Sequence, residues 1–282
     1  MRGYPLPPKL QPYFSPLYYF HIADIDPAAS VERHYPDWAG IHFYAEGEPY
    51  EAGIGDGEML AYSAFTAHGP TSQSLSLKLT RSRAWSLGIS PVGWARYADG
   101  DASDVANTFL DTGIGKGEDG AFAQLAPILD IVRRAPRNPE KTAEAVIAFL
   151  LQVPLQPSPS EDRIIALQRA LLDPDVGDVE SLVEKVNMSR RTVERLSSRY
   201  FGFAPKLLLR RQRFLRSLSK FSINPERSWS ACLDGHYVDQ AHFVRDFRGF
   251  MGMKPSEYAL MPHPILDPIF TQRLSDQGAH PA

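Results

Sequence analysis

The chain has 282 residues, of which 43% are hydrophobic and 22% charged, and its net charge is −3. This composition is globular, and the length allows two domains of ordinary size, each with its own core. A single cysteine excludes an intrachain disulfide, and the sequence shows neither a secretory signal nor the ~20-residue apolar run that a membrane helix needs. We therefore expect a cytoplasmic protein with no membrane partner.

Residues 1–100 are expected to form mainly β-structure, because short apolar runs alternate with glycine and proline. These runs span residues 18–22, 41–44, 59–65, 75–79 and 85–89. Regularly spaced short strands of this kind favour a sandwich or a small barrel.

Helices are expected next, over residues 101–110, 120–134 and 139–152. The last two carry apolar residues at helical spacing: Phe122, Leu125, Ile128, Leu129 and Val132, then Val146, Phe149 and Leu150. Such stripes pack on the β core, which is the more common outcome, or pair with another subunit. Residues 1–153 are thus interpreted as a β-rich domain with trailing helices.

Residues 154–160 hold three prolines, which favour an extended, semi-rigid linker. Residues 161–262 are expected to be all helical, so the whole chain is assigned to the α+β class. The expected helices are residues 163–172, one capped by Asp178, one capped by Ser189, and a longer one over 205–220, with a tight turn at Asn187 and a new unit starting near Asn224. Residues 263–282 are expected to be a loosely ordered tail.

One motif in the helical part occurs twice, with an offset of fifty positions. Ser189 corresponds to Asp239, Val193 to Phe243, Arg195 to Arg245, Tyr200 to Phe250, Gly202 to Gly252 and Pro205 to Pro255. Each copy has the pattern of a short helix that starts at a side-chain cap and ends at Gly-x-x-Pro. A duplicated, arginine-rich helical unit predicts two helices that read DNA.

The charge is unevenly distributed along the chain. Residues 161–262 hold 17 basic and 13 acidic residues, whereas the remainder holds 13 basic and 20 acidic. Between Lys185 and Lys220 there are eleven basic residues, and the only acid is Glu194. An acidic body with one strongly basic segment is typical of a polyanion-binding module joined to another domain.

The first turns of a helix in the major groove present side chains to base edges. In the first unit the candidate base-reading residues are Arg190, Arg191, Glu194 and Arg195, with Val193 and Leu196 facing inward. In the second unit they are Gln240, Ala241, His242 and Arg245, with Phe243 and Phe247 facing inward. The candidate phosphate contacts are Arg199, Lys206, Arg210, Arg211 and Arg248.

Other interpretations of these residues remain open. A basic helix face is often only a solvated surface, although the duplication favours DNA binding here. Arg195 and Arg245 would have a structural role if each bridged to an acid within its own unit. His242 would be a packed or solvated side chain.

Residues from about 160 to 262 resemble the DNA-binding domain of the AraC/XylS family of transcription regulators. The resemblance is carried by residues 237–258, by Ser189–Arg195 and by the Gly-Phe-Ala-Pro-Lys run that ends at Lys206. It implies seven helices, with two helix-turn-helix units on a long connecting helix that enter successive major grooves. The implied partners are promoter DNA and RNA polymerase, with control by an N-terminal domain that binds a small effector or forms a homodimer.

One part of the second unit departs from the family pattern. The family normally has a small residue, three more residues, and then a glycine before the aromatic-x-Asp-Gln sequence. Here Cys232 holds the small position, His236 holds the position of the glycine, and Gly235 lies one residue early. We therefore expect a rebuilt turn, which weakens the case for base reading by Gln240 and Arg245 more than for the first unit.

The first domain resembles, weakly, the β-rich, cupin-like sensory domains of this family. His42, Glu46 and Gly53 reproduce the latter half of a cupin metal motif, but Gly40 stands where its partner histidine belongs. Losing a ligand usually abolishes tight metal binding, so we expect no metal, no cofactor and no catalytic residue. The alternatives are a metal-dependent cupin enzyme fused to a DNA-binding domain, and an architectural DNA binder with little sequence preference. A redox role for Cys232 is disfavoured, because its position predicts a buried, inert thiol.

Overall fold

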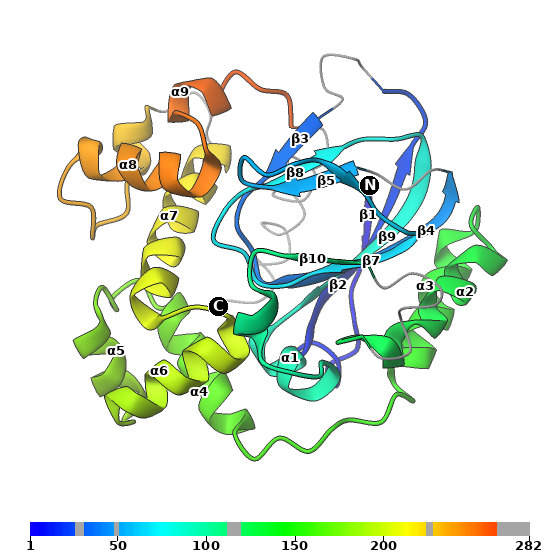
Figure 1. The fold of residues 1–282 in the computed structure, drawn as a ribbon, viewed down its shortest axis with the longest axis horizontal. Coiled ribbons are helices and arrows are strands. Elements are labelled where there is room, and N and C mark those ends of the chain that lie inside the picture. The colour runs from blue at the N-terminus through cyan, green and yellow to red at the C-terminus, as the bar shows by residue number, and fades with distance from the viewer. Residues whose placement is uncertain (26–30, 48–50, 112–119, 224–227, 264–282) are drawn as a thin grey trace.

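The computed structural model describes residues 1–25, 31–47, 51–111, 120–223 and 228–263, in which a β-rich body packs beside a group of helices (Figure 1). One antiparallel sheet has the order β1 (Arg2–Tyr4), β2 (Phe14–Ile22), β9 (Ser82–Ile89), β4 (Ala39–Gly47), β7 (Phe65–His68), β10 (Phe109–Asp111). The other has the order β3 (Val31–His34), β8 (Leu75–Lys78), β5 (Glu51–Ile54), β6 (Leu60–Ala61). The predicted α+β class, with strands first and helices afterwards, is confirmed.

Side chains alternate along each strand, so the six-stranded sheet presents two sets of side chains, one on each face, and both faces are buried. Ile41, Phe43 and Leu87 project to one face and are fully buried in the main hydrophobic cluster. His42 and Tyr44, the intervening residues of β4, line a cavity on the other face. The four-stranded sheet supplies part of the opposite wall of that cavity.

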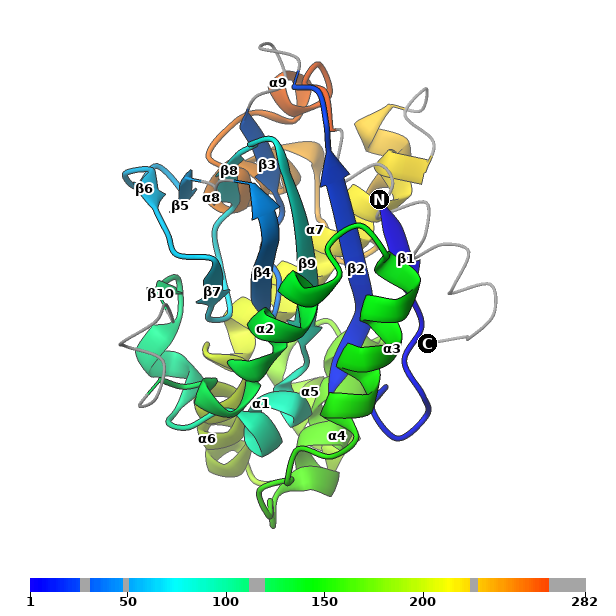
Figure 2. The same ribbon diagram turned by 90° about the vertical axis from the view of Figure 1, so that its right-hand side faces the viewer.

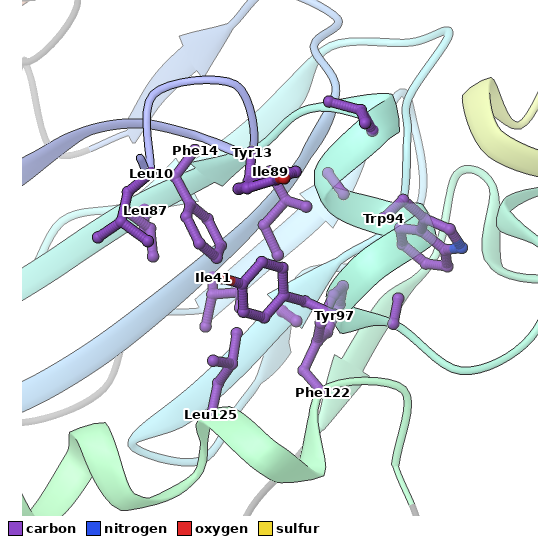
Figure 3. Packing of buried hydrophobic residues seen from close by; sticks show 14 of the residues in the cluster. Leu10, Tyr13, Phe14, Ile41, Leu87, Ile89, Trp94, Tyr97, Phe122 and Leu125 are labelled. Carbon is purple, nitrogen blue, oxygen red and sulfur yellow. The ribbon is translucent and has the colours of Figure 1, made fainter. Parts of the chain in front are cut away.

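Three helices cover the first face of this sheet: α1 (Pro91–Tyr97), α2 (Pro127–Arg134) and α3 (Pro139–Leu150). Figure 2 shows α2 and α3 lying across the strands, and Figure 3 shows aromatic and aliphatic side chains packed between the sheet and the helical segments. The predicted apolar stripes pack into the core, since Ile128, Val132, Val146 and Leu150 are all buried there. The stripes are therefore occupied within the chain.

Three predicted elements in the first domain are wrong. Residues 101–110 form only a short 3-10 turn (Ala102–Val105) followed by β10, because Asn107 adopts a left-handed φ of 55° and its side chain accepts a hydrogen bond from the Ser72 N–H at 2.7 Å. The run 59–65 is divided between β6 and β7, which belong to different sheets. The helix expected over 120–134 is a 3-10 turn (Ala123–Leu125) and then α2, which starts at Pro127, a residue without a backbone N–H to donate.

The C-terminal half is helical as predicted. It contains α4 (Glu161–Leu172), α5 (Val179–Val186), α6 (Arg190–Phe201), α7 (Pro205–Ile223), α8 (Gln240–Met251) and α9 (Pro255–Tyr258). The expected start of the second unit at Asn224 and most of the expected tail lie outside the described residues. Where the family resemblance implies a further helix, the structure has a 3-10 turn at Trp229–Cys232.

The first helix-turn-helix unit shares its core with the β-rich body. The main cluster runs without interruption from the sheet through α1 into α4, α5 and α6, and includes Leu167, Leu182 and Phe201. A separate cluster of aromatic residues surrounds Phe214 and Phe247 in the second unit. The two parts of the chain are thus packed into one another more closely than two domains with independent cores.

Candidate DNA interface

Both candidate recognition helices begin and end as their sequences require. At the start of α6 the Thr192 N–H donates to the Ser189 hydroxyl at 3.2 Å, and at the start of α8 the His242 N–H donates to the Asp239 carboxylate at 2.6 Å. Their C-caps, Gly202 and Gly252, have φ values of 81° and 70°, which favour glycine because other residues are strained there. The first unit also has Asp178 at the cap of α5 and Asn187 with φ 49° in the turn. These caps and the turn are confirmed.

Burial separates an inner from an outer face on α6. Val193 and Leu196 have no exposed surface, so they fix the helix to the core. All four predicted base-reading residues of this unit, Arg190, Arg191, Glu194 and Arg195, are exposed on its surface. Arg190 forms an ion pair with Glu180 of α5, whereas Arg191 and Arg195 form no ion pair with any described residue.

The second helix, α8, has the same division. Phe243 and Phe247 are fully buried, and Gln240, Ala241, Arg245 and Arg248 are exposed. His242 is half-buried, with its ring 5.2 Å from that of Tyr237 and its Nε2 3.4 Å from Nη2 of Arg213. Arg245 has no ion-pair partner within the described part of the chain, so neither Arg195 nor Arg245 has the acid bridge of the structural alternative.

A cationic groove of about 520 Å³ lies between the two units. It brings together Arg190 from the first unit, Lys206 and Arg210 from α7, and His242 from the second. The sequence interpretation missed Arg213, which also lines the groove; the signal was its three-residue spacing from Arg210 on one face of α7. Asp178 and Glu180 are the acids in the lining, and Glu180 is engaged by Arg190. This cationic lining suits the phosphate backbone between two successive major grooves.

A buried carboxylate fixes α8 against α7 beneath this groove. Asp246 accepts a hydrogen bond from Nε of Arg210 at 2.8 Å, from Nη2 of Arg213 at 3.3 Å and from the hydroxyl of Tyr237 at 3.2 Å. Burial, with the charge of Asp246, raises the pKa of Tyr237, so that its hydroxyl remains a donor at neutral pH. The network therefore orients two groove cations and joins the helices.

Two predicted phosphate contacts have partners elsewhere. Arg211 is only 1% exposed and reaches into the β-rich body, so its assignment to phosphate is wrong. The reason is that α7 is covered on that side by the first domain, which the helical pattern alone does not reveal. Arg199 is exposed, but its Nε lies 3.1 Å from a carboxylate oxygen of Asp101.

The turn of the second unit is rebuilt around His236. Its Nε2 lies 2.8 Å from the carbonyl oxygen of Pro174, and a Cβ added to Gly177 would lie 2.4 Å from its Nδ1. His236 thus packs against the chain just before α5. Nearby, the Asp234 carboxylate accepts a hydrogen bond from Nε of Arg216 at 2.6 Å. Burial raises the pKa of Asp234, but the hydrogen bonds from Arg216 and from the His236 N–H lower it more, so the net shift of this pKa is downward.

Comparisons with known proteins agree with this geometry at the level of the domain. A family model described as a helix-turn-helix domain matches residues 182–260. A search of curated proteins finds no match. In the described residues there is no helix of the length and apolarity needed to cross a bilayer, and no group of three or more His, Cys, Asp or Glu placed to hold a metal ion.

The chain is also similar to solved structures. ToxT from Vibrio cholerae O395 has 11% identity and a TM-score of 0.46, with 89% of this chain and 99% of that chain covered. The unsaturated fatty acid bound wild-type ToxT from Vibrio cholerae strain SCE256 has 12% identity and a TM-score of 0.44, over 88% and 95% of the two chains. The AraC-like transcriptional activator CuxR has 11% identity and a TM-score of 0.25, over 74% and 88%. By its matched family model and its two capped helices, the segment of residues 182–260 is a helix-turn-helix domain.

Proposed function

We propose that the chain regulates transcription without catalysing a reaction, by placing α6 and α8 in two successive major grooves on one face of promoter DNA. The groove between the units carries this proposal, because its lining side chains come from α6, α7 and α8 together and include the cations of Arg190 and Lys206. Base reading is assigned to Arg190, Arg191, Glu194 and Arg195 and to Gln240, Ala241, His242 and Arg245. Phosphate contacts are assigned to Arg199, Lys206, Arg210 and Arg248, and to Arg213 in addition.

The first domain, residues 1–153, is assigned the control of this binding, and residues 161–262 the reading of DNA, with 154–160 as the linker. A small effector or a second copy of the chain is the proposed input, and RNA polymerase the proposed partner at the promoter. The cavity between the two sheets supports the effector, because its walls are largely apolar.

Selection of bound fragments from a random DNA pool, at one fixed physiological salt concentration, tests the proposal. We expect a two-part site with halves ~10–10.5 base pairs apart. A single half-site would restrict base reading to one unit, and no enriched sequence would favour an architectural binder. Stoichiometric iron, zinc or manganese in the purified chain would favour the enzyme instead.

Replacing Arg191 with alanine is expected to cost ~1–3 kcal/mol of binding at one base position, because a guanidinium can form two hydrogen bonds to a guanine edge. The matched control is Lys206→Ala, which removes a groove cation and should weaken binding to every sequence alike while reducing the salt slope by about 1. Competition against sites mutated one base at a time measures both effects. Uniform weakening by Arg191→Ala would reassign that residue to phosphate.

A further inference from the structure

The cavity of the first domain has mainly apolar walls. It holds about 120 Å³ between the two sheets and is lined by aromatic and aliphatic side chains such as Tyr18, Phe20, Leu75 and Leu77. Among the described residues no lysine or arginine lines it, and its one carboxylate is that of Asp37. An apolar cavity of roughly 150 Å³ can hold benzene, so the available space suits a single ring.

One polar group in this wall is arranged to accept a hydrogen bond. Nδ1 of His68 lies 2.9 Å from the carbonyl oxygen of Gly69, and because a carbonyl only accepts, Nδ1 carries the proton. Burial lowers the pKa of His68, so the ring is neutral at pH 7 and its Nε2 is an acceptor. A Cβ on Gly40 would lie 2.5 Å from this Nε2, so the glycine makes room for the ring. Nε2 has no hydrogen-bond partner in the described part of the chain.

We propose that the cavity binds a small, uncharged ring compound with a hydroxyl group that donates a hydrogen bond to Nε2 of His68. A carboxylate is disfavoured, since it would lack a cation and would meet the charge of Asp37. This proposal rests on the proposed function, for which it names the chemical class of the effector. Binding of the ring compound is measured without DNA, so failure of this proposal can be told apart from failure of the proposed function.

Calorimetric titration of the full chain with phenol, benzene and benzoate at pH 7 provides the test. We expect phenol to bind about tenfold more tightly than benzene, and benzoate to bind more weakly than either. His68→Phe should remove the advantage of phenol but not the binding of benzene, whereas the control His21→Phe changes an exposed histidine on β2 and should have no effect. Phenol should also shift the Nε2 resonance of His68 in the parent chain, a readout that does not need the variant to fold. Equal binding of phenol and benzene, or preference for benzoate, would overturn the proposal.

A second, independent feature joins the first domain to both recognition helices. Residues 70–74, between β7 and β8, are named here the bridge segment. Pro70 contacts the end of α6, where a Cβ on Gly202 would lie 3.1 Å from its ring. The Ser74 N–H donates to the carbonyl oxygen of Phe250 at 2.7 Å, at the end of α8. Through Pro70 and Ser74, this five-residue segment therefore contacts the C-terminal ends of both recognition helices.

The middle of the bridge segment receives Arg211 from α7. Its Nη1 donates to the carbonyl oxygens of Thr71 at 2.9 Å and Asp37 at 3.1 Å, and its guanidinium lies 3.9 Å from the centre of the Trp38 ring. Burial lowers the pKa of Arg211 to about 10, and its Nε and Nη2 have no hydrogen-bond partner among the described groups. A buried cation held mainly by carbonyls is weak evidence for stability, so a positioning role explains it better.

We infer that the bridge segment and Arg211, together with Arg33 of β3, which donates to the Met251 carbonyl oxygen at the end of α8, hold the two recognition helices at one fixed separation. The reading ends of both helices stay free, because the contacts involve their C-terminal ends and the candidate base-reading residues other than the half-buried His242 are exposed. In the chain the bridge segment lies between His68 and Leu75, which both line the cavity. This inference rests on the proposed two-helix reading of DNA.

Spin labels on the full chain test the inference without DNA. Cysteines replace the exposed Glu194 and Ala241 in a Cys232→Ala background, and the interlabel distance is measured by pulsed electron paramagnetic resonance. We expect one narrow distance distribution, which broadens in Arg211→Met and in Arg33→Gln. Arg33 donates to the carbonyl oxygen of Met251 at 3.1 Å from a half-buried position, so its loss leaves the cores intact. The matched control is Arg81→Gln, whose ion pair with Asp24 lies within the first domain.

A second readout uses DNA. The preference of the parent for a two-part site over a single half-site should fall about tenfold in Arg211→Met and in Arg33→Gln, while half-site binding stays unchanged. A distance distribution as narrow as that of the parent in folded Arg33→Gln would overturn the inference, whether or not Arg211→Met folds. A parent with one narrow distance but no two-part site would instead refute the proposed function.

Discussion

Replacing Asp246 with alanine is expected to lower the free energy of unfolding of the second unit by about 3–5 kcal/mol. The carboxylate is only 3% exposed and accepts hydrogen bonds from Arg210, Arg213 and Tyr237. Its removal would leave the Arg213 guanidinium half-buried without its acid and the buried Tyr237 hydroxyl without an acceptor. Urea unfolding followed by far-ultraviolet circular dichroism measures the loss.

The control for Asp246→Ala is Asp239→Ala, which changes the same residue type on the same helix. Asp239 only caps α8, so its replacement should cost about 1 kcal/mol. A loss from Asp246→Ala no greater than that from Asp239→Ala would contradict the assigned network. In DNA selection, Asp246→Ala should retain the half-site of the first unit and lose that of the second.

Replacing Phe201 with alanine is expected to cost about 3–5 kcal/mol. The ring has no exposed surface and packs edge-on against Trp38 of the first domain, with ring centres 5.6 Å apart. Because it lies in the shared core, the change should destabilise α6 and the β-rich body together, in one cooperative transition. Circular dichroism and tryptophan fluorescence during the same urea titration provide the measurement.

Phe203→Ala serves as its control, because Phe203 is two residues along the chain and only half-buried. Its cost should be clearly smaller. Two separate transitions, of which only one moves in Phe201→Ala, would show that the first unit folds independently of the β-rich body.

The sequence predicted the features that depend on local chemistry. Ser189 and Asp239 are caps in the structure because a short side-chain acceptor before a helix satisfies a free backbone N–H, and Gly202 and Gly252 end the helices because of their positive φ. The inward faces followed from helical spacing, which placed Val193 and Phe243 correctly.

The features that the sequence did not predict depend on long-range packing. The apolar and polar pattern of residues 101–110 fits a helix, but Phe109 pairs with His68 of β7 after a left-handed turn at Asn107. Arg211 resembles its basic neighbours in sequence, and only the position of the first domain explains its burial. The groove is formed by α7 together with both units, so the place of Arg213 in its lining is visible only in the folded chain.

The shared core has a consequence for how chains of this design can diverge. A β-rich part of different sequence cannot simply be exchanged at the proline-rich linker, because Phe201 would lose its neighbour Trp38 in the β-rich body. Substitutions on the two sides of that core must compensate one another in volume. The second unit packs mainly around its own aromatic cluster, to which the body contributes Tyr35, so it has more freedom to acquire new DNA preferences.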